Sequence, residues 1–253
     1  NKAVEKYDIF ISDSKEEKET LKIDIENICS INAEKEKFPA NLYVSEVKRI
    51  MESMESDYKD SKLYNLNRFE KPEFLSQTEE VTPSRKGTAV HSVLENMDFS
   101  LSYTKDDIKN IISTLVSNGI ISDKEGESVN INSIYGFTQS DLYKRILKSD
   151  LVYKEKPFAM ELTPYEIFED EKYAGNTEKI LVHGMIDCIF KEKDKFVLVD
   201  YKTDYVPKGK EEDLKNKYSV QLRLYKLAAQ KALNCEINDV YIFSLYALKE
   251  IKI

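Results

Sequence analysis

The sequence has little cysteine, and its three cysteines are scattered. Cys29, Cys188 and Cys235 form no Cys-x-x-Cys pair among the 253 residues. This spacing argues against a disulfide framework and against a zinc or iron–sulfur site built from cysteine alone. We therefore expect no iron–sulfur cluster, and we expect each cysteine to be a small buried apolar residue in a reducing cytoplasm.

Long apolar stretches are also missing. No run approaches the roughly 20 residues that a membrane-spanning helix needs, and residues 1–7 hold no apolar signal-peptide core. We therefore expect a cytoplasmic protein with no membrane contact. The sequence does not begin with methionine, and we expect it to be part of a longer chain.

The sequence has no excess of basic charge, because 46 acidic residues outnumber 38 basic ones and the net charge is −8. Proteins that bind DNA by themselves are usually basic, because neutralising phosphate dominates their affinity. The acidic balance therefore argues against strong independent binding to DNA. It is compatible with a nuclease whose DNA is delivered by another domain, since an acidic site that collects divalent cations adds negative charge.

The chain contains a helical part followed by a strand-rich part. Residues 1–40 are expected to be an extension or linker, with a strand at Tyr7–Ile11 and then a solvated helix, and residues 41–253 are expected to be the domain. A long polar loop is expected at 55–80. The predicted helices are Glu46–Met54 capped by Ser45, Gly87–Met97 after Thr82-Pro83-Ser84, Thr104–Asn118, Asp123–Asn132 and Thr138–Lys148.

The second part is rich in β-branched and aromatic residues. Its pattern predicts strands at Val152–Leu162, Lys179–Phe190, Phe196–Tyr201 and Val240–Leu245, and a long helix at Glu212–Leu233. This order of elements predicts an α/β fold in which helices flank a mixed central sheet.

An Asp-x-Lys pair ends one of these strands. Side chains alternate along a strand, so Asp200 and Lys202 share one face and Tyr201 takes the other. Such a pair can hold a cation and an anion side by side, which phosphodiester cleavage requires. Alone, however, the pair is common and indicates a surface salt bridge.

Asp187 changes this balance, because it lies inside an apolar strand. A buried carboxylate without a partner costs several kcal/mol, so it needs a cation or several donors. If Lys191–Asp194 form a four-residue turn, Phe190 pairs with Lys195 and Asp187 pairs with Leu198. The side chain of Asp187 then points to the same face of the sheet as those of Asp200 and Lys202. We predict this shared face.

Two helices carry further candidates. His91 and Glu95 are four residues apart and project from one side of a helix. A single histidine beside an apolar stripe is more often structural, but two nearby aspartates favour a role as ligand of Mg²⁺ or Mn²⁺. Gln221 and Tyr225 have the same spacing on the helix after the Asp-x-Lys strand, where they could orient Lys202 or contact DNA.

In this order, the segments resemble the RecB-like branch of the PD-(D/E)XK nucleases. More closely, the sequence resembles the C-terminal nuclease domains of AddA-type helicase–nuclease subunits, from about Leu42 onward. The segments that carry the resemblance are Tyr43–Arg49, Arg85–His91, Glu155–Phe158, Gly184–Asp187, Asp200-Tyr201-Lys202 and Gln221-x-x-x-Tyr225.

The resemblance implies a restriction-endonuclease-like core and exonucleolytic hydrolysis of DNA during double-strand-break resection for recombinational repair. By position, His91, Asp187, Asp200 and the Tyr201 carbonyl would bind Mg²⁺ or Mn²⁺. Lys202 would be catalytic, with Gln221 and Tyr225 as an accessory motif. It further implies single-stranded DNA delivered by the helicase region of the same full-length protein, and an AddB-like partner subunit.

Two alternatives stay open beside an active nuclease domain. One is a non-catalytic module that holds DNA or another protein on a nuclease-like scaffold, which the intact Asp/Asp/Lys set disfavours. The other is a stand-alone exonuclease, which the acidic charge disfavours. The sequence has no Gly-x-x-x-x-Gly-Lys-Ser/Thr loop, so ATP would act only through a helicase portion absent from this chain.

Overall fold

The computed structural model describes residues 38–56, 81–210 and 212–253. Residues Pro39–Ile253 form one compact unit. The expected strand at Tyr7–Ile11 and its following helix lie outside the described residues, as does almost all of the expected loop at 55–80. The division of the chain at residue 40 stays a prediction.

The described residues form a set of helices and a single six-stranded sheet. The strands are β1 (Asn41–Tyr43), β2 (Val152–Leu162), β3 (Ile180–Glu192), β4 (Lys195–Lys202), β5 (Ile237–Ser244) and β6 (Lys249–Lys252). The helices are α2 (Val44–Ser56), α3 (Pro83–Asn96), α4 (Lys105–Ser117), α5 (Asp123–Ser128), α6 (Ile131–Gln139), α7 (Asp141–Ile146), α8 (Pro164–Phe168), the 3-10 helix η2 (Glu171–Tyr173) and α9 (Glu212–Leu233).

Local capping residues set where the helices begin. The hydroxyl of Thr82 accepts the Arg85 N–H at the start of α3, and Pro83 occupies a first-turn position where no backbone donor is needed. Thr104 and Asp107 form a reciprocal capping box at the start of α4. The Thr82-Pro83-Ser84 signal is the one by which the sequence predicted α3, whereas α4 was predicted from its amphipathic pattern.

Three helical predictions were wrong in detail. Ser45 does not cap α2, because the helix already begins at Val44 and the Glu46 carboxylate accepts the Tyr43 N–H at 2.8 Å. The two helices expected between 123 and 148 are three short ones, since Asn130 and Ser140 start new helices. The short elements β1, α8, η2 and β6 were not predicted.

The sheet is mixed, as expected. Its strand order is β1-β3-β4-β5-β6, and β2 pairs with β3 outside this path. β1 runs parallel to β3 and β4 runs parallel to β5, while the other pairs are antiparallel.

The turn between β3 and β4 is shorter than predicted. Glu192 pairs with Lys195, which leaves a two-residue turn with Lys193 at φ 57°, the positive φ that tight hairpins favour. The predicted pair of Phe190 with Lys195 is therefore wrong by two residues. A shift of two leaves the face of every side chain unchanged, so Asp187 and Asp200 still share a face.

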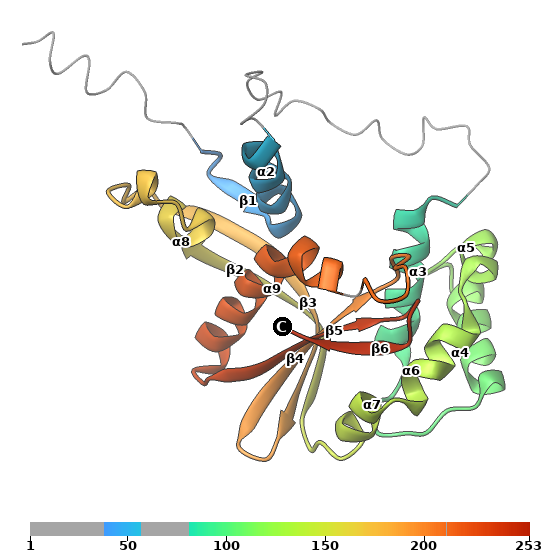
Figure 1. The fold of residues 1–253 in the computed structure, drawn as a ribbon. Coiled ribbons are helices and arrows are strands. Elements are labelled where there is room, and N and C mark those ends of the chain that lie inside the picture. Colours follow the sequence, from blue (N-terminus) through green and yellow to red (C-terminus); the bar gives the residue numbers. More distant parts are fainter. Residues whose placement is uncertain (1–37, 57–80, 211) are drawn as a thin grey trace, which may run out of the picture. The chain divides into compact units, whose positions relative to one another are not determined.

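Helices cover both faces of the sheet (Figure 1). On one face, α3–α7 pack on strand residues that include Cys188, Phe190, Val199 and Tyr201. On the other face, α9 reaches the sheet through a bond from Gln221 to Asp200. Cys188 is buried as expected, Cys235 is only partly buried, and Cys29 lies outside the described residues.

Candidate active site

The candidate site lies where the sheet forks. β1 pairs with β3 only as far as His183, and β4 pairs with β3 only from Cys188 onward. Among the described residues, the segment between them, Gly184-Met185-Ile186-Asp187, therefore pairs on one side alone, with β2. The fork leaves room beside β3 for side chains from both covering layers to meet.

Three acids lie in one row across the fork. On β2, Lys154 pairs with Cys188 and Lys156 pairs with Ile186, so Glu155 between them lies opposite Asp187. On the other side, Cys188 pairs with Val199. The next position along the two antiparallel strands therefore places Asp200 opposite Asp187. Residues directly opposite in neighbouring strands are close in space, so three strands each bring one carboxylate to the same place.

Glu155 was not predicted as a site residue. Its backbone has φ 43°, a left-handed value that is uncommon outside glycine, and it makes no ladder pair within β2. Its carboxylate Oε1 lies 3.4 Å from His91 Nδ1. The signal available in the sequence was an acid inside a strand, within the Glu155–Phe158 segment that carries the resemblance.

His91 comes from α3, the helix over the opposite face of the sheet. Its Nδ1 lies 3.6 Å from Asp187 Oδ1. Burial lowers the pKa of His91, but the hydrogen bond to Glu155 and the charges of Asp187 and Glu155 outweigh it and raise the pKa to about 8. One ligand atom from each of His91, Glu155 and Asp187 lies within 4.8 Å of the others.

Asp187 is a buried acid with one directed donor. Its Oδ2 accepts the Tyr201 N–H at 2.7 Å, and this bond bridges β3 and β4 where their ladder has ended. Burial, followed by the charge of Asp200, raises the pKa of Asp187 to about 7. The charged form of this carboxylate is therefore disfavoured, even with His91 and Lys202 nearby.

Asp200 is fully buried between two side chains. Its Oδ1 accepts a bond from Gln221 Nε2 at 2.9 Å, and its Oδ2 lies 2.7 Å from Lys202 Nζ. Asp200 and Lys202 therefore form a close ion pair in the interior of the protein. Gln221 therefore orients Asp200, whereas the sequence left it to contact Lys202 or DNA.

Lys202 is the buried cation of the site. Burial lowers its pKa, but the charges of Asp200 and Asp187 outweigh this effect and the net shift is upward. Its Nζ also lies 4.4 Å from the centre of the Tyr218 ring, a cation–π contact that favours the ammonium form.

Tyr201 and Tyr225 support the site from opposite faces. The Tyr201 backbone holds Asp187, while its side chain is buried and meets the His91 ring edge-on at 6.2 Å. The Tyr225 ring packs edge-on against Phe158 at 5.7 Å. The rings of Phe158 and Tyr225 lie over Gly184, where a Cβ would be 2.4 Å from Phe158 Cζ and 3.1 Å from Tyr225 Cε1, so any side chain at this position would have to displace the Phe158 ring.

Next to Glu155, Lys154 ties β2 to the end of α3. Its Nζ donates to the carbonyls of Glu95 and Met97 and lies 4.8 Å from the centre of the Phe99 ring. Carbonyls at the end of a helix attract cations, so this contact fixes α3 against β2 and thereby His91 beside Glu155. The Glu95 carboxylate, a weaker candidate from the sequence, is exposed.

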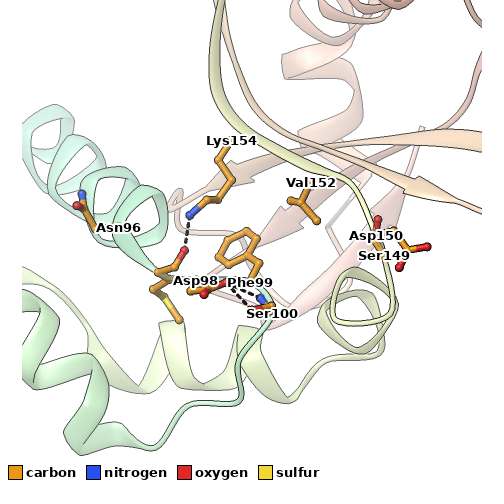
Figure 2. A pocket seen from close by; sticks show the side chains of 9 residues that line it. Asn96, Asp98, Phe99, Ser100, Ser149, Asp150, Val152 and Lys154 are labelled. Atoms are coloured by element: carbon orange, nitrogen blue, oxygen red, sulfur yellow. Dashed lines mark hydrogen bonds between the residues drawn. The ribbon is translucent and has the colours of Figure 1, made fainter.

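Lys154 also lines a pocket of about 460 Å³ at this end of α3, and the side chains around it are drawn in Figure 2. The pocket is lined by Asn96, Met97, Asp98, Phe99, Ser100, Ser149, Asp150, Val152 and Lys154. None of these residues was predicted to act in the site, and none belongs to the group formed by His91, Glu155 and Asp187.

The donor set fits a hard divalent cation. Carboxylates and an imidazole are ligands that Mg²⁺ and Mn²⁺ accept, and one ligand atom from each of His91, Glu155 and Asp187 converges at the fork. A bound cation would also relieve the repulsion between Asp187 and Asp200, which raises the pKa of Asp187.

A mixed sheet that presents Asp187, Asp200 and Lys202 at its fork defines the class of restriction-endonuclease-like nuclease domains. The sequence profile of the PD-(D/E)XK nuclease superfamily matches residues 58–249, and the chain belongs to this superfamily. The expected fold and family are thereby confirmed.

Curated relatives point to the same family. The chain is 36% identical over 218 residues to an ATP-dependent helicase/nuclease subunit of Clostridium acetobutylicum, covering 85% of this chain and 17% of the relative. It is 38% identical over 232 residues to the protein of the same name from Clostridium perfringens strain ATCC 13124, covering 85% and 18%. The chain thus spans less than a fifth of these relatives.

Among the described residues, no helix is long and apolar enough to cross a membrane.

Proposed function

We propose that this chain is a metal-dependent nuclease domain that hydrolyses DNA phosphodiester bonds as an exonuclease. The observation that carries the proposal is the buried Asp200–Lys202 pair, 2.7 Å apart, beside a second buried acid. Burying two acids and a lysine together is expensive for stability, and a site for a cation and a phosphate gives these charges a use.

We assign His91, Asp187, Asp200 and the Tyr201 carbonyl as metal ligands, and the contacts of Glu155 add it to this set. Mg²⁺ is the metal we propose, with Mn²⁺ as the alternative. A bound divalent cation supplies Lewis-acid stabilisation of charge on a phosphate and acidifies water. The protein contributes three acids on separate strands and a histidine that holds their geometry.

Lys202 has the direct catalytic role in this proposal. Its raised pKa keeps the ammonium protonated at neutral pH, so it stabilises the negative charge that builds on the phosphate during hydrolysis. Gln221 holds Asp200, and Tyr225 packs beneath Gly184; these two residues position the groups that react.

The wider setting rests on the names of the relatives. Because these names join a helicase to a nuclease, we propose that the helicase region of the same full-length protein delivers a single DNA strand and supplies all ATP chemistry. An AddB-like subunit is the proposed partner, and resection of double-strand breaks for recombinational repair in the cytoplasm is the proposed process.

A digestion assay tests the nuclease activity. The chain is incubated with a labelled single-stranded oligonucleotide in Mg²⁺, in Mn²⁺ and in EDTA. We expect cleavage only with metal, and a loss of about 10²-fold or more for Lys202→Ala, the scale of losing one group that stabilises transition-state charge. Lys109→Ala, which alters an exposed lysine of α4, is the control and should cleave normally.

The alternative is a non-catalytic scaffold that only holds DNA or another protein. It predicts the same trace of cleavage in the unaltered chain and in the Lys202→Ala variant. Equal cleavage by these two proteins, with both folded by circular dichroism, would contradict the proposed activity.

A further inference from the structure

Two exposed tyrosines pack together at one end of the sheet. The side chains of Tyr205 and Tyr246 are 70% and 53% exposed. Their ring centres are 4.8 Å apart and their planes are inclined by 70°. Two large aromatic rings that touch each other and remain open to solvent form a ready surface for a flat ligand.

This tyrosine pair lies beside the candidate active site. Tyr205 follows Lys202 by three residues and Tyr246 follows the last residue of β5 by two, while the Leu245 N–H donates to the Lys202 carbonyl at 2.8 Å. The two rings therefore stand just beyond the paired ends of β4 and β5, from which Lys202 also emerges.

The loop that carries Tyr205 also passes the first turn of α3. A Cβ placed on Gly87 would lie 3.6 Å from Thr203 Oγ1, and Gly87 is one helical turn before His91. The tyrosine pair is thus connected on one side to the Asp-x-Lys strand and on the other to the helix that supplies the histidine.

Two exposed lysines next to the pair, Lys208 and Lys210, can meet an anionic ligand. Their segment lies between Asp204, which is paired with Lys217, and the acids at 211–213, of which Glu212 is paired with Lys215. Neither of them forms an ion pair within the described ranges of the chain. Flat rings next to free ammonium groups match the chemistry of a nucleic-acid strand, which presents stacked bases and phosphates together.

We infer that Tyr205 and Tyr246 form a base-stacking platform for single-stranded DNA held with a phosphate at Lys202. The inference rests on the proposed nuclease function and extends it to the strand beside the scissile bond. Three residues of extended chain span at most roughly 11 Å, about three nucleotides at the 3.4 Å spacing of one strand. The platform therefore contacts bases within a few nucleotides of the cleaved bond, whatever their sequence.

The test compares two oligomers of equal length and charge, oligo-dT and an abasic sugar–phosphate chain. Affinity for the 253-residue chain is measured by fluorescence anisotropy at low salt in EDTA, and kcat/KM is measured in Mg²⁺. Stacking predicts that the unaltered protein prefers oligo-dT by about fivefold or more. Tyr205→Ala and Tyr246→Ala should bring this ratio close to one, while Tyr205→Phe and Tyr246→Phe should keep it.

Tyr165→Ala is the matched control, because Tyr165 is an exposed tyrosine on α8, and it should leave the ratio unchanged. A ratio near one in the unaltered protein, or an unchanged ratio in both alanine variants, overturns the inference. So does an equal loss of affinity for both oligomers, or alanine variants that lose only association with a partner protein. If Mg²⁺ cleavage is absent but the binding ratio responds as described, the nuclease proposal fails and the platform stands.

Discussion

Replacing Asp187 with asparagine should stabilise the metal-free protein at alkaline pH. Asparagine keeps an oxygen that can accept the Tyr201 N–H, the directed bond that Asp187 makes in the structure. It removes the charge that burial and Asp200 disfavour. The substitution therefore separates the electrostatic effect of Asp187 on stability from its effect on packing.

The size of the effect follows from the pKa of Asp187, about 7 against an ordinary value of 3.8. A shift of about three pKa units corresponds to about 4 kcal/mol of free energy of unfolding. Because Asp187 and Asp200 share their repulsion, we expect about 2–4 kcal/mol for Asp187 alone.

The sign of the pH dependence is fixed by where the proton is bound. Between about pH 4 and pH 7 the folded state holds a proton on Asp187 that the unfolded state has released, so the free energy of unfolding falls as pH rises through this range. His91 acts in the same direction between pH 6.5 and 8, because its pKa is raised to about 8.

Urea unfolding in EDTA at about pH 5 and about pH 8 measures this effect. The unaltered protein should be less stable at the higher pH, while Asp187→Asn should lose less stability and exceed it there. Asp150→Asn, at an exposed aspartate, is the control and should follow the unaltered protein. Mg²⁺ at about a hundred times its Kd should then restore about 2.7 kcal/mol to the unaltered protein alone.

Two results would refute the reasoning. One is a free energy of unfolding for the unaltered protein that does not change between the two pH values. The other is an Asp187→Asn variant that is less stable than the unaltered protein at the higher pH in EDTA. Either would mean that the protein already compensates the buried charge.

Three further substitutions test the supports of the site. Glu155→Gln should weaken Mg²⁺ binding about 10–100-fold, the scale of losing a supporting group at a metal site. An unchanged Mg²⁺ affinity, measured by calorimetry, would exclude Glu155 from the site. Gly184→Ala should lower the free energy of unfolding by about 1–3 kcal/mol in urea titrations because its methyl overlaps the Phe158 ring, and wild-type stability would show that the ring moves freely. Lys154→Met should lower it by about 1–3 kcal/mol by leaving helix-end carbonyls without a donor, and a stability equal to that of Lys109→Ala would contradict this contact.

Much of the fold was predictable because the spacing of apolar residues indicates which side of a helix or strand is buried. The bounds of β2 and α9 agree with the prediction, since long patterned segments leave little choice of structure. The short β1, with three residues, has no such pattern. Its pairing with β3 depends on a partner far along the chain, since Asn41 pairs with Leu181.

The shared face of Asp187 and Asp200 was also predictable, although the turn was not. A strand has a period of two, so an error of two residues in the register leaves every side chain on its face. The role of Glu155 could not be predicted from strand periodicity. Its carboxylate reaches His91 from a left-handed backbone position, and the residue pattern of β2 does not indicate a residue with positive φ.

The row of acids across β2, β3 and β4 also bears on how the protein is made. As the chain leaves the ribosome, His91 appears first, Glu155 and Asp187 follow, and Asp200 and Lys202 emerge last, with Gln221 still to come. A nascent chain that ends before β4 therefore holds an incomplete ligand set and no lysine beside it. Under the proposed function, a nascent chain would therefore gain nuclease activity only after both β4 and α9 have been synthesised.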